Sequence, residues 1–502
     1  MIKKTVIVAF VLFCVSFIKG QSTATLLSSI ADDTSTKLYA ANADFISSSP
    51  DFGLHLTTNS ASKSAENKIV STTNSAIYKW CGALTPNSIK INAKLTDATL
   101  SARAVVSTSQ NLSNPRYSKS IAVTSETNNM GSFTVKKLKP NTDYFYGIQS
   151  NSVTDTSPTS IGKFKTPQIG AHSYSFITGA CNSNSSNPVW QKIKEKKPSF
   201  MLVIGDFHYA NPNTLTESRT AYEDKILNVD NTRNLFNEVP LAVIWDDHDF
   251  AGDNSNSLFP NKDGARKAYR EYIPHYPFGD KNSNPAIYQS FVIGRVKYIL
   301  MDLRSEKTTT TIYSDTQLRW FQDECLLAKK NKQMIAWISS YGLTSDRPDS
   351  WGGNRDYLKQ RNIIFNFLTS NKIENLFIIS GDAHMAGIDD GENTDCTGII
   401  DTNKCKRAAN SKNPVYPLLQ SAPLYVKSPS QKGIITNVLP MTGDKAAGQY
   451  TKVDVVDDGG DLIQICFTVY RVDATAVESQ IANYCFKRNL KANSTNSKSF
   501  KN

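Results

Sequence analysis

The chain has 502 residues, of which 39% are hydrophobic, 10% aromatic and 20% charged. This composition supports a hydrophobic core and excludes wholesale disorder and collagen-like repeats, while the length predicts two domains rather than one. Much of the net charge of +11 lies in the N-terminal segment and in a basic tail, residues 487–502, which has no acidic residue and which we expect to be disordered. The body therefore shows no basic stripe of the kind that binds nucleic acid.

The N-terminal segment has the pattern of a signal peptide. Two lysines precede an apolar stretch over residues 5–18, which is too short to span a bilayer, and Gly20 follows it as a small residue near the expected cleavage point. We therefore predict a signal peptide at 1–20 and a secreted or lumenal protein with no membrane span; a short N-terminal anchor is the alternative. Residues 21–73, rich in Ser, Thr, Ala and Asn, are expected to form a poorly ordered leader. Sequons for N-glycosylation, which fit a secreted glycoprotein, occur at Asn111, Asn184 and Asn493.

The cysteines indicate disulfides with one thiol left over. Of the eight cysteines, Cys14 leaves with the signal peptide, and the odd number that remains implies one unpaired residue in an oxidising compartment. If that residue is Cys181, the other cysteines suffice for three bridges. The predicted pairs are Cys396 with Cys405, Cys466 with Cys485 and, by elimination, Cys81 with Cys325.

Residues 74–168 contain short alternating runs of polar and apolar residues, separated by turn-forming residues. Short strands with turns between them at this spacing are typical of a β-sandwich. The run from Leu138 to Tyr144 resembles the tyrosine corner of fibronectin type III-like domains. We therefore predict an all-β, fibronectin type III-like β-sandwich over residues 74–168. Its expected strands include 88–95, 102–107, 132–138, 144–148 and 163–167.

From residue 172 onward, short apolar runs alternate with stretches of helical periodicity. Buried strands that alternate with helices are typical of an α/β domain, and we predict one over residues 172–486. Helices are expected at 314–330 and 357–368, and a β-hairpin at 462–470 and 478–486 closes the domain. The expected buried strands are 174–178, 200–204, 241–245, 298–302, 334–339 and 376–380.

Four of these strands end in side chains that can bind a metal ion or a phosphate, and α/β sheets form their sites at the carboxyl ends of strands. Gly205 permits a sharp turn after one strand. Asp206 and Tyr209 follow it three positions apart, so one tight turn can direct both side chains at one ion. The segment Trp245–Asp249 places three acids beside His248, and such a cluster is unfavourable unless a cation offsets the repulsion.

The other two strand ends carry Cys181 and the pair Asp382 and His384. Taken alone, Cys181 fits a buried free thiol or a disulfide partner better than a ligand. Asp382 and His384 are two positions apart, which places both side chains on one side of an extended segment. Considered together, the four strand ends favour a metal site.

The four motifs, in this order, resemble those of the metallophosphoesterase superfamily, and specifically those of the alkaline phosphatase D (PhoD-like) family. The resemblance covers about residues 74–486 and includes the N-terminal sandwich. It implies that residues 172–486 form an α/β metallophosphoesterase-like sandwich domain. The matching segments are Cys181, Gly205–Tyr209, Trp245–Asp249 and Ser380–His384, with Met301–Arg304 similar to a further strand of the family.

The resemblance also implies a phosphoric ester hydrolase, acting on monoesters or diesters, with an iron and a calcium ion that activate a water molecule. Thiolate, phenolate and imidazole suit a transition metal, whereas carboxylates suit a hard ion, so Mg(II) or another divalent ion also fits the second position. Carried over by position, the Fe(III) ligands would be Cys181, Asp206, Tyr209 and His384. The Ca(II) ligands would be Asp206, as a bridge, with Asp247 and Asp382.

His248 is the candidate catalytic residue, because it follows ligand Asp247 and could contact the phosphate or protonate the leaving oxygen. The alternative is that His248 only orients Asp247. One departure from the family concerns residues 337–341, where related enzymes usually have a further histidine ligand and this chain offers only hydroxyls.

Two other functions stay open at the level of sequence. A purple acid phosphatase-like enzyme would share the Gly-Asp-x-x-Tyr motif and the sandwich, but it would lack Cys181 and carry a Gly-His-x-His motif. A catalytically silent secreted binding protein is the second alternative, and the intact acidic residues argue against it because they are unfavourable to bury unpaired. The expected partner is a small or polymeric phosphate ester.

Overall fold

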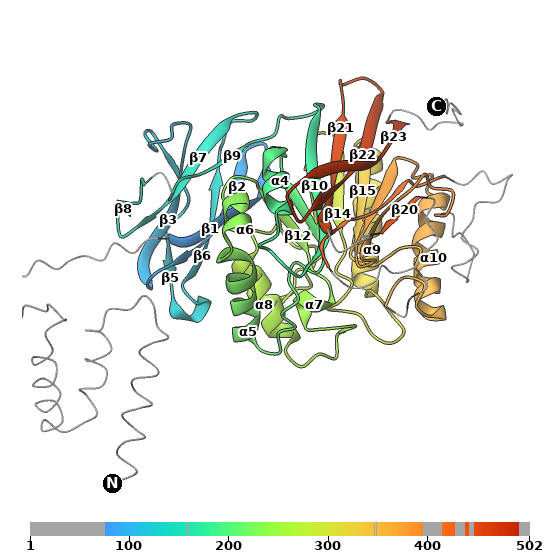
Figure 1. The fold of residues 1–502 in the computed structure, drawn as a ribbon, viewed down its shortest axis with the longest axis horizontal. Helices are drawn as coiled ribbons and strands as arrows, with labels where there is room; N and C mark the ends of the chain where they lie inside the picture. Colours follow the sequence, from blue (N-terminus) through green and yellow to red (C-terminus); the bar gives the residue numbers. More distant parts are fainter. Residues whose placement is uncertain are drawn as a thin grey trace, which may run out of the picture. The chain divides into compact units, whose positions relative to one another are not determined.

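The computed structural model describes residues 76–157, 160–345, 347, 349–394, 414–426, 437–440 and 446–490. The predicted signal peptide at 1–20, the leader at 21–73 and the Cys396–Cys405 pair lie outside these residues. Figure 1 shows the β-sheets with helices around them.

The larger sheet has ten strands and supplies three of the four strand ends that carry the motifs. Its central strands β10, β11 and β12 run parallel and side by side, as expected of buried strands in an α/β domain. In spatial order the strands are β23 (Glu478–Asn489), β22 (Leu462–Asp473), β21 (Ala446–Val456), β10 (Tyr174–Asn182), β11 (Met201–Ile204), β12 (Leu241–Ile244), β1 (Ala76–Thr85), β2 (Ser88–Leu95) and β6 (Met130–Lys136), and β19 (Pro423–Tyr425) pairs with the end of β10.

A second sheet of seven strands packs face to face against the first. Aromatic side chains fill the space between them: Phe176 of β10 contacts Tyr298 with ring centroids 5.5 Å apart, and Phe377 contacts Phe467 of β22 at 5.9 Å. The strands in order are β13 (Gln289–Ile293), β14 (Val296–Leu300), β15 (Met334–Ser339), β16 (Leu376–Ser380), β18 (Leu418–Gln420), β17 (Met385–Asp389) and β20 (Asn437–Pro440).

Two long helices, α9 (Asp315–Lys330) and α10 (Arg355–Ser370), pack on the seven-stranded sheet. Phe321 of α9 and Phe365 of α10 both contact Trp337 of β15, at centroid distances of 5.3 and 5.9 Å. The remaining helices accompany the ten-stranded sheet (Figure 1). They are α4 (Val189–Glu195), α5 (Leu215–Tyr222), the π-helical turn η3 (Glu223–Leu227), α6 (Asp230–Phe236), α7 (Asp247–Phe250) and α8 (Lys262–Tyr272), while the short η1 (Ser125–Thr127) precedes β6.

Residues 76–165 are all-β, but one of their two layers belongs to the ten-stranded sheet. Strand β1 pairs in parallel with β12 at Gly82 and Leu241, and a Cβ at Gly82 would stand 2.2 Å from the Leu241 carbonyl oxygen, so only glycine allows this approach. The sheet therefore continues across the predicted domain boundary at 168–172. The fibronectin type III-like assignment stays a prediction. A separate six-stranded sheet covers this region with β4 (Arg116–Tyr117), β3 (Thr99–Ser107), β7 (Asp143–Ser150), β8 (Val153–Thr154), β5 (Ile121–Val123) and β9 (Gly162–Lys165).

The predicted strands and helices of the α/β region are present, with changes at several of their ends, such as β14, which spans Val296–Leu300 where 298–302 was expected. Two changes bear on the site and on the tail. Strand β10 was expected to stop before Cys181 but runs to Asn182, because its last residues pair with β19. Strand β23 ends at Asn489, so the first residues of the predicted tail belong to the sheet. Residues 491–502 lie outside the described part of the chain.

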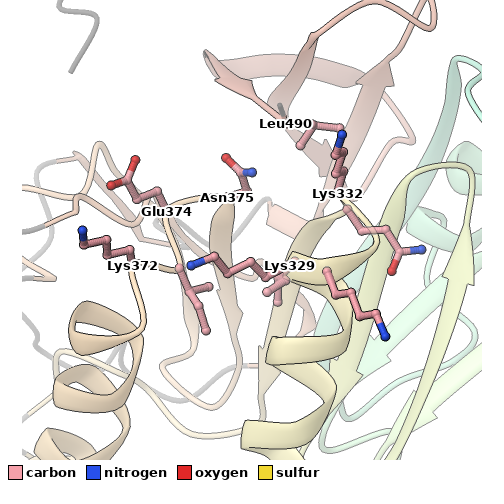
Figure 2. A pocket seen from close by; sticks show the side chains of 10 residues that line it. Lys329, Lys332, Lys372, Glu374, Asn375 and Leu490 are labelled. Atoms are coloured by element: carbon pink, nitrogen blue, oxygen red, sulfur yellow. The ribbon is translucent and has the colours of Figure 1, made fainter. Parts of the chain in front are cut away.

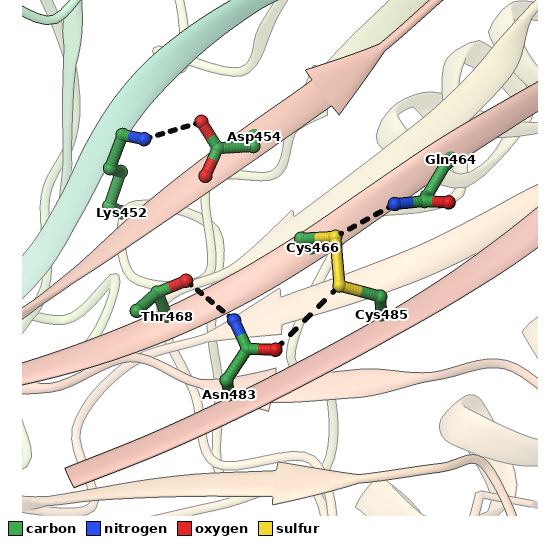
Figure 3. The surroundings of a disulfide bond; sticks show 7 residues. All are labelled: Lys452, Asp454, Gln464, Cys466, Thr468, Asn483 and Cys485. Carbon is green, nitrogen blue, oxygen red and sulfur yellow. Dashed lines mark hydrogen bonds and ion pairs between the residues drawn. A yellow bond between two sulfur atoms is a disulfide. The ribbon is translucent and has the colours of Figure 1, made fainter. Parts of the chain in front are cut away.

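The structure confirms one predicted disulfide and corrects another. Cys466 and Cys485 are bonded and stand opposite each other on β22 and β23 (Figure 3). The predicted bond between Cys81 and Cys325 is wrong, because both are buried free thiols that belong to different hydrophobic clusters. Burial raises the pKa of the Cys81 thiol to about 12, which keeps it protonated and unreactive.

Candidate functional site

The predicted site residues meet at the carboxyl ends of strands from both large sheets. Cys181 lies at the end of β10, Asp206 follows β11, and Asp247 follows β12. Asp382 and His384 follow β16 of the facing sheet. A direct contact joins the two sets of strand ends, since the Ser340 hydroxyl after β15 lies 3.1 Å from the Asp246 carboxylate after β12.

Four of these residues have left-handed backbone angles. The φ values are 54° at Cys181, 51° at Asp206, 68° at Asp382 and 52° at His384. Such angles are unfavourable for residues other than glycine and occur preferentially at functional sites. Hydrogen bonds between strand ends hold them in place, with the Cys181 amide donating to the Gly205 carbonyl oxygen at 3.2 Å.

The first group of possible metal ligands combines four kinds of donor. The ligand atoms of Cys181, Asp206 and His384 all lie within 4.8 Å of one another. The Tyr209 hydroxyl joins them, 3.1 Å from Nε2 of His384. Cys181 and Asp206 are 1% exposed, so the thiol and the carboxyl face each other away from bulk water. A thiol, a phenol, an imidazole and a carboxyl together suit a transition metal.

The second group shares Asp206 with the first. The ligand atoms of Asp206, Asp247 and His248 lie within 4.8 Å of one another. The Asp247 carboxylate is held in place by two backbone amides, those of His248 at 2.9 Å and Asn254 at 2.7 Å. The side chain of Asp206 therefore stands between two groups of donors.

The acidic groups of the site oppose one another's ionisation. Burial raises the pKa of Asp206 well above its ordinary value, and the nearby charges of Asp247 and Asp246 raise it further. Burial likewise raises the pKa of Asp382, with added repulsion from Asp246, and that of the Cys181 thiol, with added repulsion from Asp206. A cation reverses each of these shifts. The donor set and its electrostatics therefore both fit bound metal.

Two predicted residues occupy less central positions. Asp382 is 8% exposed and belongs to neither group, although the charge of Asp247 is among those that raise its pKa. The His248 ring lies against the Tyr209 ring, with centroids 4.2 Å apart, and its Nδ1 is 2.6 Å from Oδ1 of Asn211. The other imidazole nitrogen is not engaged by Asn211.

The structure adds residues to which the sequence motifs assigned no role. Asp249, the third acid of its motif, accepts backbone N–H groups from His208 at 3.0 Å and from Asp246 at 3.1 Å, so it ties two ligand-bearing loops together. Arg304 contacts Asp246 and approaches Asp247. The only sequence signal for Arg304 was its position in the segment Met301–Arg304, which resembles a further strand of the family.

A hollow of about 190 Å³ lies at the amino ends of β15 and β16, opposite to the strand ends that carry the site (Figure 2). Lys329, Lys332 and Lys372 line it together with Glu374. Lysines are favourable at the carboxyl ends of helices, and α9 and α10 both end here. The candidate metal ligands among the described residues all lie away from this hollow.

Comparison with known proteins agrees with the geometry. Residues 176–404, which contain every predicted metal ligand, match the family model of the PhoD-like phosphatases. This segment is therefore similar to the PhoD-like phosphatases. A curated relative, alkaline phosphatase D of Bacillus subtilis (strain 168), is 22% identical over 311 residues. The match covers 50% of this chain and 52% of the relative, so the chain spans about half the length of that relative.

Solved structures show the same fold. A structure of PhoD matches with a TM-score of 0.66 and 14% identity, covering 85% of this chain and 93% of that one. A purple acid phosphatase from yellow lupin (Lupinus luteus) seeds matches with a TM-score of 0.57 and 11% identity, covering 86% and 78%. The chain therefore has a metallophosphoesterase-like α/β sandwich fold. Within the described residues, its helices are too short or too polar to cross a membrane.

Proposed function

We propose that this protein is a secreted, metal-dependent phosphoric ester hydrolase with two cations in its active site. The observation that carries the proposal is the place of Asp206, whose carboxylate lies within 4.8 Å of ligand atoms in both groups. A carboxylate has two oxygens and can bridge two ions. The family match over residues 176–404 supports the same chemistry.

The two groups differ in the ion that they suit. Thiolate, phenolate and imidazole favour Fe(III) on one side, with Cys181, Asp206, Tyr209 and His384 as its ligands. Carboxylates favour a hard ion on the other, Ca(II) or alternatively Mg(II), with Asp206 and Asp247 of the second group as its ligands. Asp382, which lies outside both groups, would be its third ligand.

The bound cations would supply a water molecule of lowered pKa and neutralise charge on the phosphate oxygens. The chain's own residues orient the reaction. Asn211 holds Nδ1 of His248 at 2.6 Å, which leaves Nε2 as the atom available to contact the phosphate or pass a proton to the leaving oxygen. Burial of Asp206 excludes bulk water from its side of the site.

The substrate class follows from the relatives' names alone and is a phosphate ester, monoester or diester. The test is hydrolysis of aryl phosphate monoesters and diesters by the purified protein, before and after a chelator removes metal. We expect turnover that chelation abolishes and that metal restores. Asp247→Asn should lower kcat at least a hundredfold, while Asp458→Asn, the same change at an exposed turn, should leave it unchanged.

The metal assignment has its own readout. A ferric phenolate absorbs visible light, so the loaded protein should be coloured, and Tyr209→Phe should remove the band. Absence of metal-dependent turnover of either ester would leave the silent binding protein as the better description.

A further inference from the structure

Arg304 is a buried cation beside the proposed metal site. Its side chain is fully buried. The guanidinium bonds to the Asp246 carboxylate through Nε, and its Nη2 lies 2.6 Å from Oδ2 of Asp349 and 3.7 Å from Oδ2 of Asp247. It stacks on the Tyr341 ring at 4.3 Å. One planar side chain therefore reaches three carboxylates.

The residue is held in this place by its own backbone. Arg304 follows strand β14, and its amide donates to the Asp302 carboxylate at 3.1 Å. The same carboxylate accepts the indole N–H of Trp245 at 2.8 Å, and Trp245 precedes the Asp246–Asp249 motif. The Asp302 carboxylate thus connects the end of β14 to the end of β12, and Asp247 follows β12.

The partners of Arg304 are held from their other sides as well. Asp246 receives the Ser340 hydroxyl at 3.1 Å. Asp349 receives the Tyr341 hydroxyl at 3.0 Å and also pairs with Lys307. These groups are all buried, and buried charges hold a fixed geometry when each is paired. Arg304, Asp246 and Asp349 therefore form a buried network of paired charges next to Asp247.

We propose that Arg304 is a positioning residue for the hard-ion side of the site. It acts through the planar fork of its guanidinium, which fixes Asp246 and Asp349 together and keeps Asp247 in ligand geometry. Partners behind metal ligands commonly change metal affinity or activity 10- to 100-fold when removed. The inference rests on the two-cation site of the proposed function. Charge alone does not suffice, because lysine carries the same charge without the fork.

The experiment compares Arg304→Lys with Arg295→Lys by calorimetric titration of the metal-stripped full chain with Ca²⁺. Arg295 stands at the other end of β14 and forms its own fork on the buried carboxylate of Asp457, so it is a matched control remote from the site. We expect at least tenfold weaker Ca²⁺ binding for Arg304→Lys and wild-type binding for Arg295→Lys. Thermal unfolding of both variants reports whether each is folded.

Ser340→Ala is the milder second variant if Arg304→Lys does not fold, because it removes one donor to Asp246 and leaves every charge in place. It too should weaken Ca²⁺ binding. Wild-type or tighter binding by the folded Arg304→Lys variant, equal losses in Arg304→Lys and Arg295→Lys, or no Ca²⁺ binding by the wild type would each overturn the proposal. A protein that binds Ca²⁺ with this dependence on Arg304 but cleaves no ester would refute only the proposed function.

Discussion

Single residues of the site adopt unfavourable states that the rest of the fold enforces. Cys181, Asp206, Asp382 and His384 have left-handed backbones, and the acids among them are buried beside like charges. Such strain is common where residues serve binding or catalysis rather than stability. Replacing one of them can therefore stabilise the metal-free protein while it removes function.

Asp206→Asn tests whether replacing a site residue stabilises the metal-free protein and removes function, at the residue that the two donor groups share. Asparagine tolerates the left-handed backbone and removes one buried charge, so we expect the metal-free protein to gain about 1 kcal/mol in free energy of unfolding and the loaded protein to lose its activity. Urea unfolding measures the first effect. Asp302→Asn is the contrast: its carboxylate accepts N–H groups from Trp245 and Ile287, so the change should destabilise by about 1–3 kcal/mol.

Gly205→Ala probes the turn between β11 and Asp206. The φ of +80° is unfavourable for alanine, and the added Cβ would stand 2.5 Å from Cβ of Asp246. Gly170→Ala is a matched control, with a φ of +74° and no atom within 4 Å of the added Cβ. We expect a loss of about 1 kcal/mol at Gly170 from backbone strain and at least about 1 kcal/mol more at Gly205 from the contact. Equal losses at the two positions would show that the contact is unimportant.

At the scale of elements, the site depends on loops that join neighbouring strand ends. The loop after β12 is connected to the loop after β11 through Asp249, whose carboxylate accepts amides of His208 and Asp246. It is connected to the end of β14 through Asp302 and Trp245. Strands supply the positions, and these loop contacts supply the directions of the side chains.

The β22–β23 hairpin is the element whose stability depends on the disulfide. The bond between Cys466 and Cys485 closes a segment with a sequence separation of 19, for which loop-closure entropy predicts about 3 kcal/mol of stabilisation. Replacing both cysteines by alanine should lower the free energy of unfolding by up to this amount. The adjacent cross-strand pair Thr468 and Asn483, hydrogen-bonded at 2.8 Å, is the control (Figure 3), and its replacement by alanines should cost less than about 1 kcal/mol.

At the scale of the whole molecule, the two large sheets share one aromatic core. Phe176, Phe200, Phe291 and Tyr298 contact one another across the interface at centroid distances of 4.7–5.8 Å. The ligand-bearing strand ends come from both sheets, so their separation depends on this packing. We therefore expect a change in this core to alter the distance between Asp206 and His384.

His275 is one source of the pH dependence of global stability, and His208, whose pKa burial also lowers to about 3, is another. Burial lowers the pKa of the His275 imidazole to about 3, and the nearby charges of Lys90 and Arg270 contribute. The unfolded chain binds the proton near pH 6.5. The contribution of His275 to the free energy of unfolding is therefore constant above that value and falls as pH decreases from about 6.5 toward 3. The loss from this group is at most about 2 kcal/mol between pH 7 and pH 5.

Free energies of unfolding measured at several pH values test the contribution of His275. His275→Phe, which can retain the stacking on Phe278 at 4.1 Å, should reduce the slope below pH 6.5. A wild-type slope in His275→Phe would assign the acid sensitivity to other groups.

The sequence alone determined six buried strands, two helices and the closing hairpin of residues 172–486, together with the types of side chain at the strand ends. It did not predict helices α4 to α8 or strands β13 and β17 to β21. The features that it determined depend on local periodicity and on neighbouring residues, such as Asp206 and Tyr209 in one turn. The motifs also led to the PhoD-like family model that residues 176–404 match. The end of β10 was missed because a distant partner intervened, since β19 pairs with its last residues.

Only the tertiary structure decided which residues share a contact. It placed β1 in the ten-stranded sheet, kept Cys81 and Cys325 in separate clusters, and brought Arg304 against Asp246. The physical reason is that these contacts join residues more than fifty positions apart, and their distances depend on how the sheets pack and not on any local pattern. The shared position of Asp206 between two donor groups arises in the same way.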